Sequence, residues 1–172
     1  MLLRCFHTRD RNLQIRLFNT FVRPILEYAS PVWSPHLKRD ITVVERVQKY
    51  FTKCLRGLSN KSYTDRLAAL NQSSLQLRRL RTDLIFLYKI LHGLVDNSLK
   101  SLFTLSADVV TSDRSLRGHA WKLQKPKPRT DMLKYDYFCR VINYWNALPK
   151  HVVETKSLPV FKQRLCTHLH CS

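Results

Sequence analysis

The sequence predicts a mostly α-helical fold, a bundle of about five to seven helices with a small β element near residues 117–125. Apolar residues recur every three or four positions over long stretches, which places them on one face of a helix. Residues that favour helix starts precede these stretches, and glycines follow two of them. The apolar fraction of 44% is ordinary for a globular protein, so global disorder is not expected.

The first helix is expected over residues 10–29, with Asp10 as its N-cap. Pro24 lies inside this stretch, where it removes one backbone hydrogen bond and crowds the preceding turn, so we expect a kink there. Residues 29–33 predict a tight corner that buries the indole of Trp33. The apolar residues that define the buried face are Leu13, Leu17, Phe18, Phe21, Val22, Ile25, Leu26 and Ala29.

The second helix is expected over residues 35–56. Ser34 and Pro35 favour its start, and Gly57 is suited to end it. One side of this helix is apolar and the other side is basic, so we expect the first to pack and the second to stay free for binding. The apolar side comprises Leu37, Ile41, Val44, Val47, Phe51 and Leu55.

Capping boxes predict two further helices, over residues 63–71 and 74–92, and Gly93 follows the second of these. The pairs that would form the boxes are Ser62 with Asp65 and Ser73 with Gln76. In the second half of the chain, helices are expected over residues 134–147 and from Ser157 onward.

The hydropathy pattern weakens between the two halves of the chain, and we place a division there. Residues 1–94 would form a helical domain, residues 95–115 a loop or linker, and residues 116–172 a basic C-terminal subdomain. Residues 120–124 are the expected strand of the small β element.

Charge is the most unusual property of the chain. Thirty Lys and Arg stand against twelve Asp and Glu, which gives a net charge of +18 and a pI near 10.2. Such an excess repels itself in a compact state and is typical of proteins that bind polyanions. The alternative is that the charge only keeps the protein soluble.

The candidate nucleic-acid-binding residues fall into three groups, on the second helix, at the start of the fourth helix and in a basic stretch near the β element. They are Lys38, Arg39, Arg46, Lys49 and Lys53; Arg78, Arg79 and Arg81; and Arg117, His119, Trp121, Lys122, Lys125, Lys127 and Arg129. Lysine and arginine contact phosphates, and an aromatic ring can stack on an unpaired base. Trp121 is the stacking candidate, and a place in the core is the open alternative for it.

No catalytic residue is expected. Nucleotide polymerisation needs two carboxylates that share divalent metal ions, and the sequence has no adjacent pair of acids. The chain also lacks the phosphate-binding loop, HExxH and CxxC motifs. We expect no metal site and no cofactor, because the four potential ligands of the tail (Cys166, His168, His170 and Cys171) are too crowded to surround one ion.

Several motifs, in this order and spacing, resemble the region just beyond the polymerase core in reverse transcriptases of non-LTR retrotransposons of the Jockey and CR1 type. The resemblance covers about residues 13–169. The first motifs are Val22-Arg23-Pro24-Ile25-Leu26-Glu27-Tyr28, Pro31-Val32-Trp33-Ser34-Pro35 and Val47-Gln48-Lys49. Those that follow are Leu58, Tyr63, Arg66, Leu67, Leu70 and Leu75; Arg78-Arg79-Leu80-Arg81; Asp83-Leu84; Tyr88-Lys89-Ile90-Leu91-His92-Gly93; Arg117-Gly118-His119; Lys122-Leu123; Tyr144-Trp145-Asn146-Ala147-Leu148-Pro149; Phe161-Lys162; and Arg164-Leu165.

The resemblance implies that residues 1–94 are thumb-like and that the chain corresponds to the thumb and the start of the C-terminal region of an RNA-directed DNA polymerase. Such a part grips RNA or DNA, above all template RNA or an RNA–DNA hybrid, against palm and fingers domains that this chain does not contain. It is expected to be inactive alone. The alternative is a non-catalytic helical protein-interaction or scaffold module derived from such an element.

The sequence predicts an intracellular protein of the nucleus or cytoplasm without a membrane partner. It has no signal-peptide-like stretch at its start and no apolar run long enough for a membrane span. Its five cysteines are an odd number, which favours free thiols in a reducing compartment.

Overall fold

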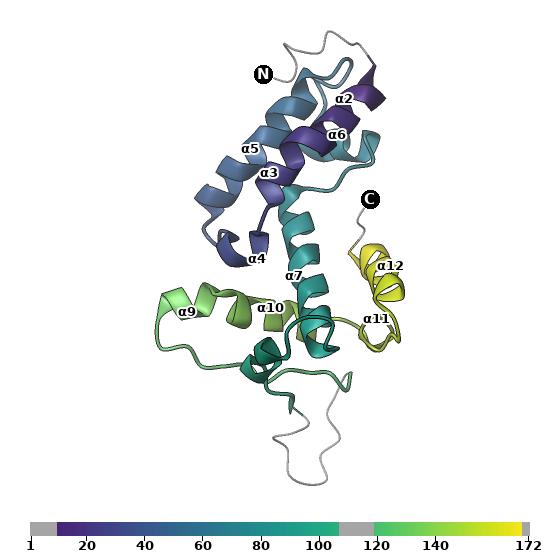
Figure 1. The fold of residues 1–172 in the computed structure, drawn as a ribbon. Coiled ribbons are helices and arrows are strands. Elements are labelled where there is room, and N and C mark those ends of the chain that lie inside the picture. Colours follow the sequence, from purple (N-terminus) through teal and green to yellow (C-terminus); the bar gives the residue numbers. More distant parts are fainter. Residues whose placement is uncertain (1–9, 107–118, 170–172) are drawn as a thin grey trace. The chain divides into compact units, whose positions relative to one another are not determined.

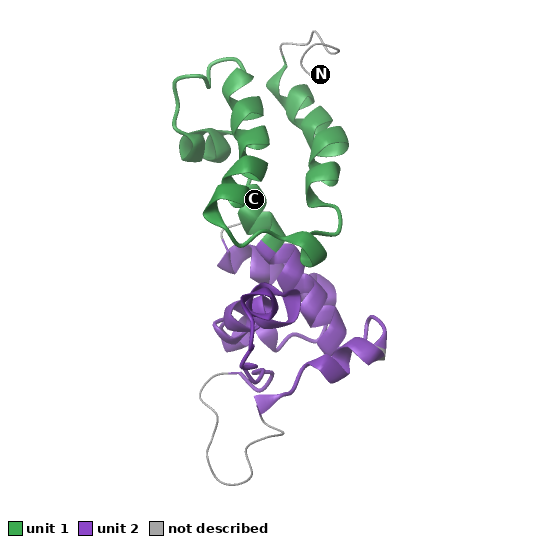
Figure 2. Ribbon diagram, turned by 90° about the vertical axis from the view of Figure 1, so that its left-hand side faces the viewer, with its two compact units in different colours: residues 1–79, 172 green, residues 80–171 purple. Residues whose placement is uncertain are grey.

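A computed structural model describes residues 10–106 and 119–169, and within them the fold is mostly helical, as predicted (Figure 1). The chain divides into two compact units, one within residues 1–79 and one within residues 80–171 (Figure 2). The division falls inside helix α7 (Leu75–Leu91), whereas the hydropathy pattern suggested residues 95–115. Each unit has a hydrophobic core of its own.

The first helix of unit 1 is interrupted just before Pro24. It comprises α2 (Arg11–Leu17), the π-helical segment η1 (Phe18–Val22) and α3 (Arg23–Glu27). The predicted kink therefore takes the form of a widened turn, after which Pro24 occupies the first turn of α3, where a missing N–H costs little. The Asp10 side chain accepts a hydrogen bond from the backbone N–H of Asn12 (2.9 Å), as expected of an N-cap.

The corner after α3 is present, but the prediction that it buries Trp33 is wrong. Ala29 adopts a left-handed conformation (φ 49°) and leads into the short helix α4 (Ser30–Trp33). Trp33 is 39% exposed, and its indole N–H donates to the backbone carbonyl of Tyr28. The local turn thus satisfies the indole N–H without placing the ring in the core.

Helices α5 (Lys38–Cys54) and α6 (Tyr63–Ala69) complete unit 1. Ser62 Oγ accepts from the backbone N–H of Asp65 (3.2 Å), so the predicted start of α6 is confirmed. The prediction that Gly57 ends α5 is wrong: the C-cap Leu55 is already extended (ψ 139°), and Gly57 (φ +74°) lies in the turn after it. The rings of Phe18 and Phe51 stack with centroids 4.4 Å apart and join α5 to η1. The core of this unit comprises Phe18, Phe51, Leu55, Leu58 and Leu70.

Unit 2 packs the later helices around the apolar face of α7. The helix predicted over residues 134–147 is divided at Asp136, whose carboxylate accepts from the backbone N–H of Phe138 and caps the second part. Trp145 and Phe161 are fully buried in this core. The elements after α7 are the 3₁₀ helix η2 (Asn97–Leu102), α9 (Asp131–Tyr135), α10 (Tyr137–Asn146), α11 (Lys150–Val153) and α12 (Leu158–His168).

The β element expected near residues 117–125 is, in the part that the structure describes, one antiparallel bridge between Leu105 and Leu123. On the other side of Leu123, the Asn146 side chain accepts from its N–H (2.9 Å) and donates to its carbonyl (2.8 Å). The Asn146 side chain thus satisfies both backbone groups of Leu123 that face away from the bridge, so in the described residues no further strand pairs with Leu123. Phe103, inside the expected linker, is itself buried in the core of unit 2.

Candidate nucleic-acid interface

The outer face of α5 carries most of the first group of candidate residues. Arg39, Arg46 and Lys53 follow one another at seven-residue intervals, which returns them to the same side of a helix, and all three are exposed. Lys38 is exposed at the start of the helix. Lys49 is half-buried, and its Nζ lies 5.2 Å from the centroid of the Tyr63 ring. The structure therefore brings three of these five cations together on one face.

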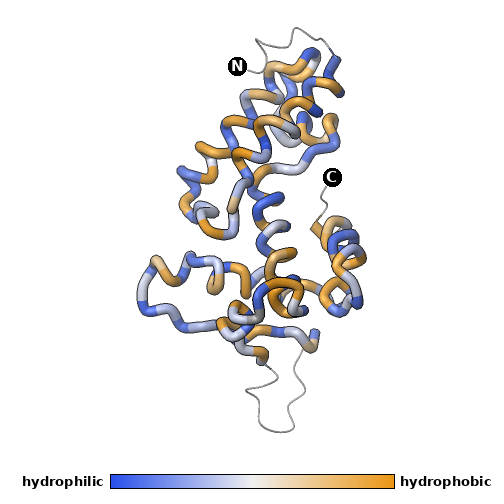
Figure 3. Tube along the Cα trace, in the orientation of Figure 1, coloured by the Kyte–Doolittle hydropathy of each residue, from blue (hydrophilic) through white to orange (hydrophobic). Residues whose placement is uncertain are grey.

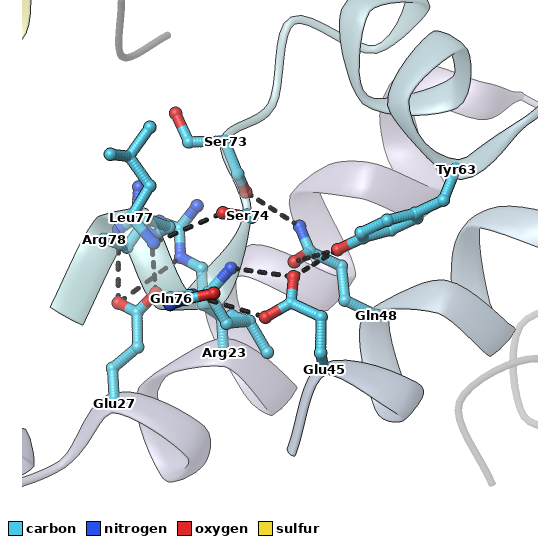
Figure 4. Close-up of polar contacts among 11 residues, drawn as sticks. Arg23, Glu27, Glu45, Gln48, Tyr63, Ser73, Ser74, Gln76, Leu77 and Arg78 are labelled. Carbon is cyan, nitrogen blue, oxygen red and sulfur yellow. Dashed lines mark hydrogen bonds and ion pairs between the residues drawn. The ribbon is translucent and has the colours of Figure 1, made fainter. Parts of the chain in front are cut away.

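The opposite face of α5 is held by a buried polar network (Figure 4). Glu45, which is 6% exposed, accepts hydrogen bonds from the backbone N–H groups of Leu75 (3.0 Å) and Gln76 (3.2 Å) and from the Tyr63 hydroxyl. Gln48 Nε2 donates to the carbonyl of Ser73 (3.2 Å). Burial and the hydrogen bond to Glu45 raise the pKa of Tyr63, so its hydroxyl remains a donor. This network determines which side of α5 faces outward.

The start of α7 is capped differently from the prediction. The box of Ser73 with Gln76 is replaced by Ser74, whose Oγ accepts from Leu77 N–H (3.2 Å), and by the Glu45 carboxylate. Glu45 lies 30 residues before Leu75, so no local sequence signal identifies it as the cap. The carboxylate neutralises partial positive charge at the N-terminus of α7.

The acids of α5 leave its outer face positive. The carboxylate of Glu45 is buried inside unit 1, where it accepts hydrogen bonds. Asp40 lies in the first turn of α5, where its negative charge interacts favourably with the helix dipole. Among the described residues, the ion pairs are Arg23–Glu27, Arg78–Glu27, Arg140–Asp83 and Lys150–Glu154. None of these ion pairs involves a cation of α5. Arg39, Arg46 and Lys53 are therefore available to bind an anionic ligand.

Apolar residues share this outer face. Tyr50 and Val43 were not predicted there, and the expectation that Val47 lies on the packed side of the helix is wrong. Tyr50 is 68% exposed, and Val43 and Val47 are exposed beside it. Tyr50 and Val43 lie three or four residues from the cations, and this spacing is the signal that could have identified them. Figure 3 shows how apolar and polar positions alternate along α5.

The three arginines of α7 do not form such a face. Arg78 is paired with Glu27, with Nη2 and Oε2 3.1 Å apart. Arg79 is 2% exposed, and its guanidinium lies 5.8 Å from the centroid of the Trp33 ring. Arg81 is half-buried in unit 2. Arg78 and Arg79 thus hold unit 1 together, which accounts for cations near the N-terminus of a helix.

In the third group, the late cations are available and the aromatic residues are not. Lys125, Lys127 and Arg129 are exposed on the extended segment before α9, and Lys122 is half-buried. Arg117 lies outside the described residues. The extended segment follows from its two prolines, at positions 126 and 128.

His119 and Trp121 belong to unit 2's interior. His119 is 1% exposed, and its Nε2 lies 3.2 Å from the carbonyl oxygen of Trp145. Trp121 is half-buried against the core, with its ring 4.8 Å from that of His92. The alternative left open for Trp121, a place at the core, is the one observed. His119 is therefore too buried to stack on a base, and Trp121 is only partly exposed.

Carboxylates that could hold metal ions are not gathered in the described part of the chain. In residues 10–106 and 119–169 there is no group of three or more His, Cys, Asp or Glu side chains with metal-binding geometry. A shallow cleft of about 420 Å³ in unit 2 contains no carboxylate. It is lined by His151, Val160, Gln163, Arg164, Thr167 and His168. His170 and Cys171 of the tail are not among the described residues.

None of the helices within residues 10–106 and 119–169 combines the length and the apolar character that a membrane span requires. Cys54 and Cys139 are free thiols.

Comparison with curated proteins finds a relative in a nematode. A Caenorhabditis elegans protein named "Uncharacterized protein B0403.1" is 38% identical over 95 residues, which are 54% of this chain and 48% of that protein. The chain therefore spans about half the length of this curated relative. No family model matches the sequence. No solved structure matches it either.

Proposed function

We propose that this chain is the nucleic-acid-binding, thumb-like and post-thumb part of a non-LTR retrotransposon reverse transcriptase. It would hold template RNA or an RNA–DNA hybrid for a palm and fingers outside this chain, inside the nucleus or cytoplasm. The observation that carries the proposal is the outer face of α5, where Arg39, Arg46 and Lys53 are exposed and take part in no ion pair with a described acid. The motif resemblance supports the origin, and the net charge of +18 supports a polyanionic ligand.

The mechanism is phosphate binding without base readout. Arginine and lysine neutralise phosphates and release counterions, so affinity falls with salt by a slope of roughly −0.7 to −0.9 per contact on a log–log plot. Lys125, Lys127 and Arg129 offer a second set of such contacts on an extended segment. About six contacts in all correspond to a slope of roughly −4 to −5.

Charge reversal tests the role of the α5 face. The variant Arg39→Glu, Arg46→Glu, Lys53→Glu should bind RNA at least about tenfold more weakly, with a salt slope shallower by about 2 to 3, because it loses three phosphate contacts. The measurement is fluorescence anisotropy of a labelled RNA at several salt concentrations. The matched control is Arg16→Glu, Lys61→Glu, Lys156→Glu, which changes the net charge equally at exposed cations on three different segments. Equal losses in both variants would mean that only the net charge matters.

Primer extension tests the catalytic part of the proposal. Purified chain supplied with a primed RNA template, deoxynucleotides and Mg²⁺ or Mn²⁺ should incorporate nothing, because the sequence has no adjacent pair of acids to hold the catalytic metal ions. Incorporation that survives repurification would contradict the proposal.

A protein-interaction module is the second candidate, and one observation favours it. Phe21, Ile25, Tyr28 and Val32 are exposed along η1, α3 and α4, and exposed apolar patches of this kind mark interaction surfaces. The charge-reversal experiment separates the two candidates. If RNA binding is salt-insensitive or absent in the unchanged protein, the scaffold function is favoured.

A further inference from the structure

Tyr50 is a large aromatic side chain on a face where the fold does not need one. It is 68% exposed on α5, while the buried aromatic contact of that helix is made by Phe51. Arg46 lies one turn before Tyr50 and Lys53 one turn after it, and both are exposed. Residues three and four apart are neighbours on a helix surface, about 5–6 Å between Cβ atoms. The ring therefore lies between two cations.

We propose that the outer face of α5 binds single-stranded nucleic acid, with the Tyr50 ring stacked on an unpaired base and Arg46 and Lys53 on the phosphates to either side. This inference rests on the proposed function and adds the class of ligand. Base–aromatic stacking tolerates any sequence, because every base has a π-face. The expected ligand is thus an unpaired segment of template or product, without sequence preference.

The composition of the face favours an unpaired strand over a duplex. A duplex presents phosphates to a helix but keeps its base faces stacked, so it would use Arg39, Arg46 and Lys53 and leave Tyr50 without a partner. An unpaired strand uses both kinds of group. Val43 and Val47 extend the apolar part of the face beside the ring.

The same face is less suited to a protein partner. Protein interfaces have an apolar centre, and their charged rim complements a partner's charges. Along the outer face of α5, the cations alternate with apolar residues and do not surround them. In chain order, the residues of this face are Arg39, Val43, Arg46, Tyr50 and Lys53. Alternation of cations with an aromatic ring is the pattern of single-strand binding surfaces.

Removal of the ring tests the inference. The full chain and its Tyr50→Ala and Tyr50→Phe variants are titrated with labelled oligouridine and with an RNA hairpin of equal nucleotide number. Tyr50→Ala should lose about 5- to 150-fold in affinity for oligouridine, the range for one stacked base. Its affinity for the hairpin stem and its salt slope should stay nearly unchanged, because no phosphate contact is lost. Tyr50→Phe, which keeps the ring, should bind like the unchanged protein.

Tyr28→Ala is the matched control. Tyr28 is also an exposed tyrosine of unit 1, but the residues three and four positions away from it are Pro24, Ile25, Pro31 and Val32, none of them charged. This variant should bind oligouridine normally. Far-UV circular dichroism of each variant establishes that the helices are intact.

The outcomes separate the inference from the proposed function. If Tyr50→Ala binds oligouridine as well as the unchanged protein, or loses the same factor on both RNAs, the stacking inference is overturned. The proposed function still stands in that case if the charge-reversal variant of α5 is impaired. If neither change affects binding, both proposals are wrong.

Discussion

At the scale of single residues, Glu45 shows how one buried charge serves the fold of unit 1. Its carboxylate accepts hydrogen bonds from two backbone N–H groups at the start of α7 and from Tyr63. A helix has unsatisfied N–H groups in its first turn, and here a different helix satisfies them. Glu45 therefore determines the rotation of α5 and, with it, the outward direction of the basic face.

Substitution of Glu45 should be among the most destabilising changes in unit 1. Glu45→Ala leaves buried donors without a partner, so we expect a loss of roughly 2–4 kcal/mol in the free energy of unfolding. Glu45→Gln keeps one acceptor oxygen and should lose less. The measurement is urea unfolding followed by circular dichroism. Asp40→Ala is the control, an exposed acid on the same helix, with an expected loss below about 1 kcal/mol. Equal losses for Asp40→Ala and Glu45→Ala would contradict this role.

At the scale of elements, helix ends with a local cause are predictable from the sequence, and those with a distant cause are not. Asp10 and Ser62 act within a few residues of the helices that they cap, and both were predicted. The cap of α7 comes from Glu45 on another helix. Trp121 packs against the ring of His92, which is distant from it in the sequence. Periodicity cannot identify such partners, because they are neighbours in space only.

Gly57 allows a direct test of the turn that follows α5. Its φ of +74° is strained for residues with a side chain, and a Cβ there would meet only Arg11 Nη2, at 3.9 Å. The cost of Gly57→Ala should therefore be backbone strain, about 1 kcal/mol in the free energy of unfolding. Gly57→Asn should cost less, because asparagine tolerates the left-handed conformation better than alanine. Equal stability of Gly57→Ala and the unchanged protein in urea unfolding would contradict this explanation.

At the scale of the whole molecule, composition predicted a basic chain but not which cations are available. Arg39 and Arg79 are both arginines on long helices, yet one is exposed and the other is 2% exposed beside Trp33. The difference follows from packing around α4, which the hydropathy pattern did not show. A ligand contacts only the exposed cations. The net charge of +18, by contrast, destabilises the compact state of the whole chain through self-repulsion.

Two histidines of unit 2 should make the folded chain sensitive to acid. Burial lowers the pKa of His119, and the nearby cation Lys122 lowers it further. The Trp145 carbonyl and Glu154 raise this pKa but do not cancel the effect of burial. Burial also lowers the pKa of His92, together with Lys100. Histidine in an unfolded chain has a pKa of about 6.5, so as the pH falls the unfolded state takes up protons first. The free energy of unfolding should be highest above about pH 6.5 and should decrease from there toward the lower pKa values of the folded state.

Urea unfolding at a series of pH values between about 5 and 8, above the range where most carboxylates titrate, measures this decrease. The variant His92→Gln, His119→Gln should be less stable overall but should lose most of the dependence on pH, because glutamine takes up no proton in this range. His151→Gln, at an exposed histidine, is the control and should keep the dependence. If the double variant retains the full decrease toward low pH, the growing net positive charge of the whole chain, rather than these two buried rings, is its cause.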